Sequence, residues 1–495
     1  MLTEGSTHMT VFRLSLLLLV LPLLLFSQQI PVSPAIEKAA ALEEEGRFIE
    51  ATIVLGTALA NQISSPYPEI RKQLEFELDR LDRIRKDYSL SKNRLFEVLQ
   101  SSVRDITEKE FERWIGEGRF DYRLIDSVQY FVGPSRSNLF FRYPELVSRR
   151  IDLPDLSRFE QSALNAVRTI KQAAQERQAP FVLPKSFHNI MAVTLDADAI
   201  PTGETVRAWL PIPRAFPHQI SFRLQTTSNP VISVGDYESP IRSVVLEQKT
   251  EKGKPTEFRI DYEYTAFGIW FDLQPSAVQP YDIASPFYRS YVSEAPHVKF
   301  TDQIRRLSQE LAGADTNALV KARKFYNWIS ENIKYSYALE YSTIRNISDY
   351  CLTKKYGDCG QEALLFIALC RANGIPARWQ SGWLTMPGGK TIHDWTEIYI
   401  LPYGWVPVDP YMGIFAMQYF NGPEEQRREI RDFYFGGLDQ YRMAANSDHS
   451  QELTPPKRSM RSDNVDFQRG ELEYGGINIY FDKYKYNLTV EEIVR

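Results

Sequence analysis

The sequence has few cysteines, no excess of positive charge and a single long apolar run, and each shortage excludes a class of protein. Its 495 residues include three cysteines, which is too few for a scaffold held together by disulfides. The 58 Lys and Arg residues do not outnumber the 63 Asp and Glu residues, so the basic surface typical of a nucleic-acid-binding protein is missing. We therefore expect no nucleic-acid partner.

Two kinds of ligand motif are also missing. The cysteines and histidines do not have the Cys-x-x-Cys or His-x-x-x-His spacing of a zinc site. The full pattern of a glycine-rich phosphate-binding loop is not present either. From these absences we predict neither a metal site nor a cofactor.

The apolar run extends from Leu14 to Phe26, after Arg13 and before Ser27. Its 13 residues are fewer than the roughly 20 that a helix needs to cross a bilayer. A short apolar stretch behind a positive charge is typical of a secretory signal peptide, which we predict for residues 1–28. The protein would then be exported to the periplasm or the extracellular space. An uncleaved anchor is the alternative, and only that form would make a membrane a partner.

Periodicity divides the rest of the chain into four parts and predicts an α+β protein. The first part has helical spacing of apolar residues and begins with a pair of helices similar to a tetratricopeptide hairpin. It is either a partner-binding arm or a domain packed against the rest of the chain. The second part has short alternating strands separated by turn residues, as in a β-sandwich. The predicted parts are an α-helical domain at 33–180, a β-sandwich at 186–275, a core at 295–415 and a C-terminal extension packing on that core at 416–495.

Cys359 has the sequence context of a nucleophile. It stands in Gly357-Asp-Cys-Gly360, at the start of an apolar stretch that predicts a helix over 358–373. The unpaired amides and the positive dipole end of a helix N-terminus favour a thiolate and can stabilise an oxyanion. A small buried cysteine is the alternative reading of this position alone.

His393 and Asp409 provide the partners that such a nucleophile needs. His393 opens an alternating strand, and Asp409 ends the next strand after the turn at 402–404. The two residues are 16 positions apart, which suits opposite strands of one hairpin. Asp409 could then fix one imidazole nitrogen while the other faces the thiol, as nucleophile, base and orienting carboxylate.

Together these segments resemble the transglutaminase core. The resemblance includes Gly-Asp-Cys-Gly at 357–360, Ala-Leu-Cys-Arg-Ala-Asn-Gly-Ile-Pro-Ala-Arg at 368–378, His-Asp-Trp at 393–395 and Trp-Val-Pro-Val-Asp-Pro at 405–410. It implies a papain-like fold in which a helix bearing the cysteine packs on an antiparallel sheet. It also implies Cys359 as nucleophile, His393 as general base and acid, and Asp409 as orienting residue. The layout is similar to that of secreted bacterial transglutaminase-like proteins.

The resemblance adds candidates for the oxyanion site and the cleft. Tyr335 is the aromatic residue that could supply a second oxyanion donor, since core packing is the better explanation for Trp328. The remaining candidates are Gly360, Gln361 and Trp395, although Gln361 could equally bond within its own helix.

Two functions remain open at this point. The first is a cysteine peptidase, amidase or acyltransferase that acts on peptide or protein amides through a thioester, with hydrolysis favoured over cross-linking. The second is a noncatalytic binding or assembly module on the same core, with a protein partner at the N-terminal helical domain. Cys351 and Cys370 could form a disulfide or remain buried thiols, and the polar segment 446–469 could fold over the cleft or pack elsewhere on the core.

Overall fold

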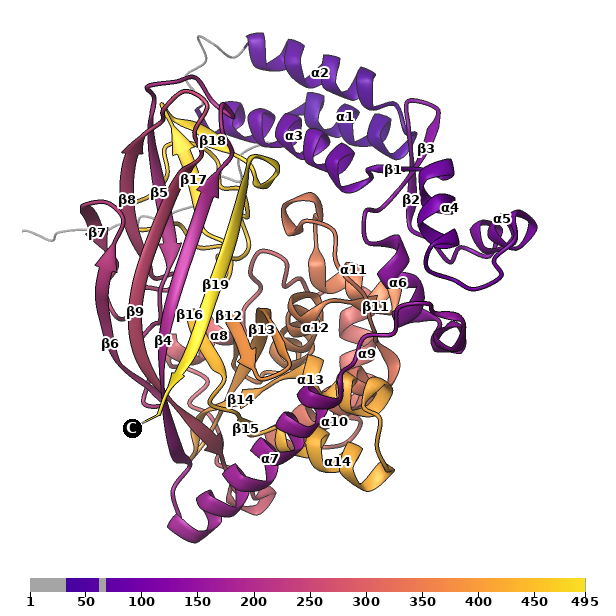
Figure 1. Cartoon of the computed structure of the whole chain (residues 1–495). Helices are drawn as coiled ribbons and strands as arrows, with labels where there is room; N and C mark the ends of the chain where they lie inside the picture. Colours follow the sequence, from indigo (N-terminus) through magenta and orange to yellow (C-terminus); the bar gives the residue numbers. More distant parts are fainter. Residues whose placement is uncertain (1–32, 62–67, 495) are drawn as a thin grey trace, which may run out of the picture.

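The computed structural model describes residues 33–61 and 68–494, and Figure 1 shows their arrangement. The predicted signal peptide lies outside these residues. Among the helices that are described, none is both long and apolar enough to cross a membrane.

The N-terminal part is mainly helical, and Figure 1 shows α1, α2 and α3 lying side by side. Gly46, at φ +77°, makes the turn between the first two helices, where a Cβ would come within 2.8 Å of the Leu124 carbonyl oxygen. A small sheet with the order β1-β3-β2 interrupts the helices. The elements are α1 (Pro34–Glu44), α2 (Phe48–Asn61), α3 (Pro68–Asp87), β1 (Leu90–Ser91), α4 (Lys92–Gln100), α5 (Glu108–Gly116), β2 (Tyr122–Ile125), β3 (Val128–Phe131), α6 (Ser135–Arg142) and a 3₁₀ helix (Pro144–Arg149).

The next helix, α7 (Ser157–Arg177), does not belong to that group, although the sequence places it in one helical domain. Its apolar face, which includes Phe159, Val167 and Ile170, packs against residues of the sandwich and the core. In Figure 1 it lies beside α14 (Glu424–Phe433), at the opposite end of the molecule from α1–α3. Periodicity reveals that α7 has a buried stripe but does not reveal which neighbour covers it.

Two five-stranded sheets form the β-sandwich, and four of their strands, β15 (Gly437–Leu438), β17, β18 and β19, come from residues 416–495. One sheet has the order β15-β9-β4-β19, with β6 also on β9, and the other has the order β18-β17-β5-β8-β7. The strands are β4 (Phe181–Leu195), β5 (Thr205–Pro211), β6 (Gln219–Thr227), β7 (Val231–Val234), β8 (Ser243–Lys249), β9 (Thr256–Trp270), β17 (Glu471–Tyr474), β18 (Ile477–Ile479) and β19 (Tyr484–Ile493).

This topology corrects the expected extension at 416–495. Its first half packs on the core, but β19 pairs along β4 from Tyr484↔Leu195 to Ile493↔Ser186, and β17 pairs with β5. The alternating strands β4 and β9 need a neighbour on each edge, and the required partners are distant in sequence. A purely sequential reading of the chain therefore misses them.

The core contains a buried helix against an antiparallel sheet with the order β14-β13-β12-β16. Its elements are a 3₁₀ turn (Pro275–Ala277), α8 (Pro286–Val292), α9 (Asp302–Ala312), α10 (Ala318–Asn332), β10 (Lys334–Tyr335), a 3₁₀ turn (Tyr341–Thr343), α11 (Ile347–Lys354), β11 (Tyr356–Gly357), α12 (Cys359–Ala372), β12 (Ala377–Met386), β13 (Gly389–Ile400), β14 (Gly404–Val408), α13 (Pro410–Ile414), a π-helical turn (Phe415–Tyr419), α14 (Glu424–Phe433), β15 (Gly437–Leu438) and β16 (Arg442–Asn446). The predicted mixed helix-and-sheet fold class is confirmed.

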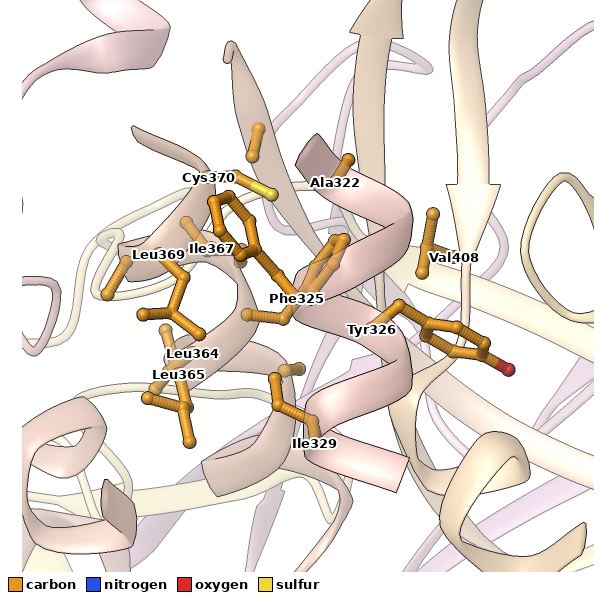
Figure 2. Packing of buried hydrophobic residues seen from close by; sticks show 14 of the residues in the cluster. Ala322, Phe325, Tyr326, Ile329, Leu364, Leu365, Ile367, Leu369, Cys370 and Val408 are labelled. Atoms are coloured by element: carbon orange, nitrogen blue, oxygen red, sulfur yellow. The ribbon is translucent and has the colours of Figure 1, made fainter. Parts of the chain in front are cut away.

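The helix α12 is buried on all sides, from Cys359 to Arg371. Its apolar residues pack with those of α10, as Figure 2 shows for Leu364, Leu365 and Phe325. Trp328 of α10 is half-buried against the same cluster, as expected from its place in a helical stripe. A helix that is apolar all round must be covered from every side. The sheet, α9, α10 and α11 together provide this cover and so fix the position of its N-terminus.

We predict that Gly382→Ala destabilises the fold. A Cβ at Gly382 would meet the Met443 carbonyl oxygen at 1.8 Å, because β12 and β16 run close together there. Overpacking of this kind costs about 1–3 kcal/mol, so thermal unfolding monitored by circular dichroism should begin at a lower temperature. The control is Gly56→Ala in α2, where a Cβ meets no atom within 4 Å. Equal midpoints for the two variants would contradict the prediction.

Candidate active site

Cys359 is the first residue of α12, and the residues before it fix its place. The Asp358 side chain accepts a hydrogen bond from the Gln361 amide at 3.1 Å, and the Gln361 side chain accepts one from the Asp358 amide at 3.3 Å. This capping box satisfies two amides of the first turn. Of the two roles open to Gln361, the structure therefore supports bonding within its own helix.

His393 and Asp409 come together across the hairpin of β13 and β14. The strand begins at Gly389, so His393 lies in the middle of β13 instead of opening it, and the pairing of Thr396 with Val408 brings it beside Asp409, the residue after β14. His393 Nε2 is 2.8 Å from Asp409 Oδ2, and both side chains are buried. Asp409 also caps α13 by accepting a hydrogen bond from the Met412 amide at 3.1 Å. The carboxylate is thus fixed from two sides.

The sulfur of Cys359 contacts Asp394, the residue after His393. Its Sγ donates to Asp394 Oδ2 over 3.5 Å. None of the hydrogen bonds among the described residues joins the sulfur to the imidazole or occupies Nδ1 of His393. The structure therefore brings Cys359 to the His393–Asp394 step of β13, with Nδ1 as the imidazole nitrogen that remains free.

Tyrosine side chains form the walls around this step. Tyr341 Oη lies 2.8 Å from Asp358 Oδ1 and 3.2 Å from Asp394 Oδ2, above the helix start at Gly360. A Cβ at Gly360 would come within 2.0 Å of Tyr341 Oη, which explains the glycine there. Tyr411 contacts the His393 ring edge-on, with centroids 5.3 Å apart.

Of the two aromatic candidates, Tyr335 lies near the sulfur and Trp395 lies behind the imidazole. Tyr335 pairs with Gly357 in the β10–β11 ladder, two residues before Cys359. Burial, and to a smaller extent the neighbouring Cys359, raises the pKa of Tyr335. Trp395 is only 2% exposed and packs with a sandwich cluster, although its ring stacks on His393 at 6.0 Å. Trp395 therefore supports the imidazole from behind instead of lining a cleft.

The electrostatics of the thiol differ from the sequence-based expectation. Burial, followed by the carboxyl groups of Asp394 and Asp358, raises the pKa of Cys359 well above its usual value. A helix N-terminus alone would lower the pKa of the thiol, but the deep burial of this turn outweighs that effect. Burial also lowers the pKa of His393, so the resting pair is a neutral thiol and a neutral imidazole near pH 7.

Arg442 is a site residue that the sequence does not reveal. It lies in β16 with its Nη2 3.2 Å from Asp409 Oδ2 and its Nε donating to Asp439 Oδ2 at 3.1 Å. The pKa of Asp409 is lowered because His393 and Arg442 together outweigh the effect of burial. Arg442 also contributes to the lowered pKa of His393. Since β16 follows β14 by more than 30 residues, no local motif connects Arg442 to Asp409.

The segment between β16 and β17, residues 447–470, is called the strap below. Gln468 in the strap donates from Nε2 to Asp394 Oδ1 at 2.8 Å and to the backbone oxygens of Gly382 and His393, each at 3.0 Å. Arg83 of α3 donates to the backbone oxygens of Ser462 and Arg461 at 2.7 and 2.8 Å. The segment 446–469 therefore reaches the residues around the sulfur through Gln468 and also packs against α3 of the helical part.

The remaining cysteines are free thiols. Cys351 and Cys370 are both fully buried, and neither forms a disulfide. In the described part of the chain, no group of three or more His, Cys, Asp or Glu side chains is arranged to hold a metal ion.

Comparison with known families adds one decisive match. Residues 305–410 match the family model of the transglutaminase-like superfamily, and this range contains Cys359, His393 and Asp409. Residues 305–410 form a transglutaminase-like core. The match covers the core elements from α9 to the start of α13 and leaves out the helical domain, the sandwich and the strap.

The curated relatives share only part of this chain. An uncharacterised protein from Haemophilus influenzae is 25% identical over 146 residues, which are 24% of this chain and 39% of that protein. YebA from Bacillus subtilis, also uncharacterised, is 28% identical over 131 residues, which are 23% of this chain and 18% of YebA. The chain thus spans well under half the length of these relatives.

Solved structures similar to this chain have low identity. A candidate cysteine protease from Cytophaga hutchinsonii has a TM-score of 0.41 and 16% identity, covering 64% of this chain and 93% of that one. The periplasmic domain of TgpA from Pseudomonas aeruginosa has a TM-score of 0.26 and 15% identity, covering 53% of this chain and 95% of that one.

The charges of Arg442 and Asp439 act in opposite directions on the pKa of His393, and this can be tested by removing each charge. Arg442 lowers the pKa of His393 and Asp439 raises it, so Arg442→Met should raise that pKa and Asp439→Asn should lower it. NMR titration of labelled imidazoles would measure the direction of each shift, with His393→Gln identifying the signal. Shifts of the same sign in both variants would show that loosened packing, and not charge, is responsible.

Proposed function

We propose that this chain is an exported cysteine enzyme that cleaves peptide or protein amide bonds through a thioester of Cys359. The observation that carries the proposal is the 2.8 Å bond between His393 Nε2 and Asp409 Oδ2, next to the residue that touches the sulfur. It supports a nucleophile, a base with a defined tautomer and an orienting carboxylate at one edge of the sheet.

The proposed reaction begins with a neutral pair. Asp409 accepts the Nε2 proton of His393, so that Nδ1 is the basic nitrogen. As the sulfur attacks the amide carbon, the thiol proton passes to Nδ1 and a C–S bond forms. The amides of Cys359 and Gly360, which the capping box does not use, and Tyr335 are the proposed donors to the oxyanion. The imidazolium then protonates the leaving amine as the C–N bond breaks, which gives the thioester.

The thioester is resolved by a second acceptor. His393, neutral again, takes a proton from water or from an amine as that nucleophile attacks, and the thiol regains a proton when the C–S bond breaks. Water gives a carboxylic acid, and an amine gives a new amide. We propose hydrolysis as the main outcome because water needs no binding site of its own.

Location and partners are part of the proposal. The short apolar run behind Arg13 supports export to the periplasm or the extracellular space. The N-terminal helical domain leaves Ile49 and Ile53 on one face of α2 exposed at 57% and 60%, which would suit a protein partner.

A noncatalytic binding module is the second candidate, and burial of the site favours it. Cys359 is 8% exposed and His393 is 1% exposed, so a substrate can reach the sulfur only after the cover around it moves. An enzyme must undergo that movement, whereas a binding module need not.

Thiol labelling distinguishes the two candidates. We predict that iodoacetamide near neutral pH modifies Cys359 at least about tenfold faster than Cys351 or Cys370, because a base assists only Cys359 and the other two are fully buried. His393→Ala should remove the difference. Mass spectrometry of the tryptic peptides would measure the labelling of each thiol. Equally slow modification of all three thiols would favour the binding module.

Product analysis tests the reaction itself. Wild-type protein incubated with a peptide mixture and a primary amine should release shorter peptides, with less amine incorporation than hydrolysis. Cys359→Ala should reduce both by about three orders of magnitude or more, because no other described thiol lies at the site. Cys370→Ala is the matched control and should keep the wild-type rate. Cleavage that survives in Cys359→Ala would refute the proposed function.

A further inference from the structure

The sulfur of Cys359 has a hydrogen-bond partner that does not belong to the proposed triad. Neighbouring residues on a strand point to opposite faces, so the His393 and Asp394 side chains leave β13 in different directions. The imidazole goes to Asp409, whereas the Asp394 carboxyl accepts from the Cys359 thiol over 3.5 Å. At rest, the hydrogen of the thiol is therefore directed toward a carboxyl group and not toward the base.

Three separate segments hold the Asp394 carboxyl in this position. Gln468 of the strap donates to Oδ1 at 2.8 Å, and Tyr341, from the segment after β10, lies 3.2 Å from Oδ2. The third donor is the thiol itself. Asp394 is 3% exposed, and a rotation away from the sulfur would leave the buried thiol without its described partner, whereas Tyr341 keeps Asp358 and Gln468 keeps two backbone oxygens.

The bonding pattern also indicates what the carboxyl does to the sulfur. Both oxygens of Asp394 face donors, namely the thiol and Gln468 Nε2. Burial, followed by the acidic neighbours Asp466 in the strap and Asp358 in the turn before α12, raises the pKa of Asp394 well above its usual value. Each carboxylate near the thiol disfavours a negative sulfur, and Asp394 is the one in contact with it.

We propose that Asp394 is a positioning residue that holds Cys359 as a hydrogen-bonded thiol in the resting protein. Reaction then requires the thiol to exchange its bond to Asp394 Oδ2 for one to Nδ1 of His393, from which the proton transfer described above begins. This inference rests on the proposed function, in which the sulfur is the nucleophile. Because Gln468 bonds both Asp394 and the backbone of His393, a displacement of the strap would favour the exchange.

Asp394→Asn tests the proposal through the reactivity of the thiol. The amide keeps the shape of the side chain, cannot ionise and can direct an N–H toward the sulfur, so the thiolate fraction at a given pH should rise. We expect iodoacetamide to label Cys359 about three- to tenfold faster than in wild type, with the rate profile moved to lower pH. A rate equal to or below that of wild type would overturn the proposal.

Asp466→Asn is the matched control. Asp466 is a buried carboxyl of the same strap network that bonds Ser381 and Asn446 and does not contact the sulfur. Because loss of the Asp466 charge favours the ionised form of Asp394, Asp466→Asn should label no faster than wild type. If Asp466→Asn accelerates labelling as much as Asp394→Asn does, general loosening of the strap explains the effect and the proposal fails.

A second measurement does not depend on an Asp394 variant that folds. The difference between infrared spectra of wild type and Cys359→Ser isolates the S–H stretch of Cys359. We expect it at lower frequency than the bands lost in Cys351→Ser and Cys370→Ser, because those two thiols have no hydrogen-bond partner among the described residues. Three coincident bands would contradict the proposal. Neither labelling nor infrared spectroscopy needs turnover, so both test the role of Asp394 alone. The proposed function fails by a different result, namely amide cleavage that persists in Cys359→Ala.

Discussion

The contact between the first turn of α12 and the middle of β13 is the constraint on which the site depends. The helix is covered from every side, so its N-terminus cannot shift without opening the core. The capping box at Asp358 and Gln361 fixes where the helix begins. Because the cysteine is the first helical residue, both constraints act directly on the sulfur and set it against the backbone at Asp394.

The same burial decides the charge state of the site. Removing water penalises a thiolate and an imidazolium alike, and each therefore rests in its neutral form. Asp409 stays ionised because a histidine and an arginine share its carboxylate. A nucleophile of this kind depends on a base at the moment of attack instead of on a preformed ion pair.

Much of the core could be predicted because its signals are local. The apolar run after Cys359 predicts a helix whatever surrounds it, and a short turn between two strands predicts that His393 and Asp409 face each other. Tyr341, Gln468 and Arg442 could not be found in this way, since each reaches the site from another segment of the chain. The direction of the thiol's pKa was wrong for a related reason, because a helix N-terminus is recognisable in sequence but the depth of its burial is not. The strands β17 and β19 were misplaced because the pairing of sheet edges depends on the whole fold.

The position of these contributions along the chain has a consequence for biosynthesis. Arg442, Gln468 and the strands β17, β18 and β19 all come from the last 54 residues, after every member of the proposed triad has been made. A nascent chain that emerges in order from its N-terminus thus carries the cysteine, histidine and aspartate before it has the parts that anchor them. The surroundings of the proposed nucleophile are thus assembled only when these later strands dock, after the cysteine itself has been synthesised.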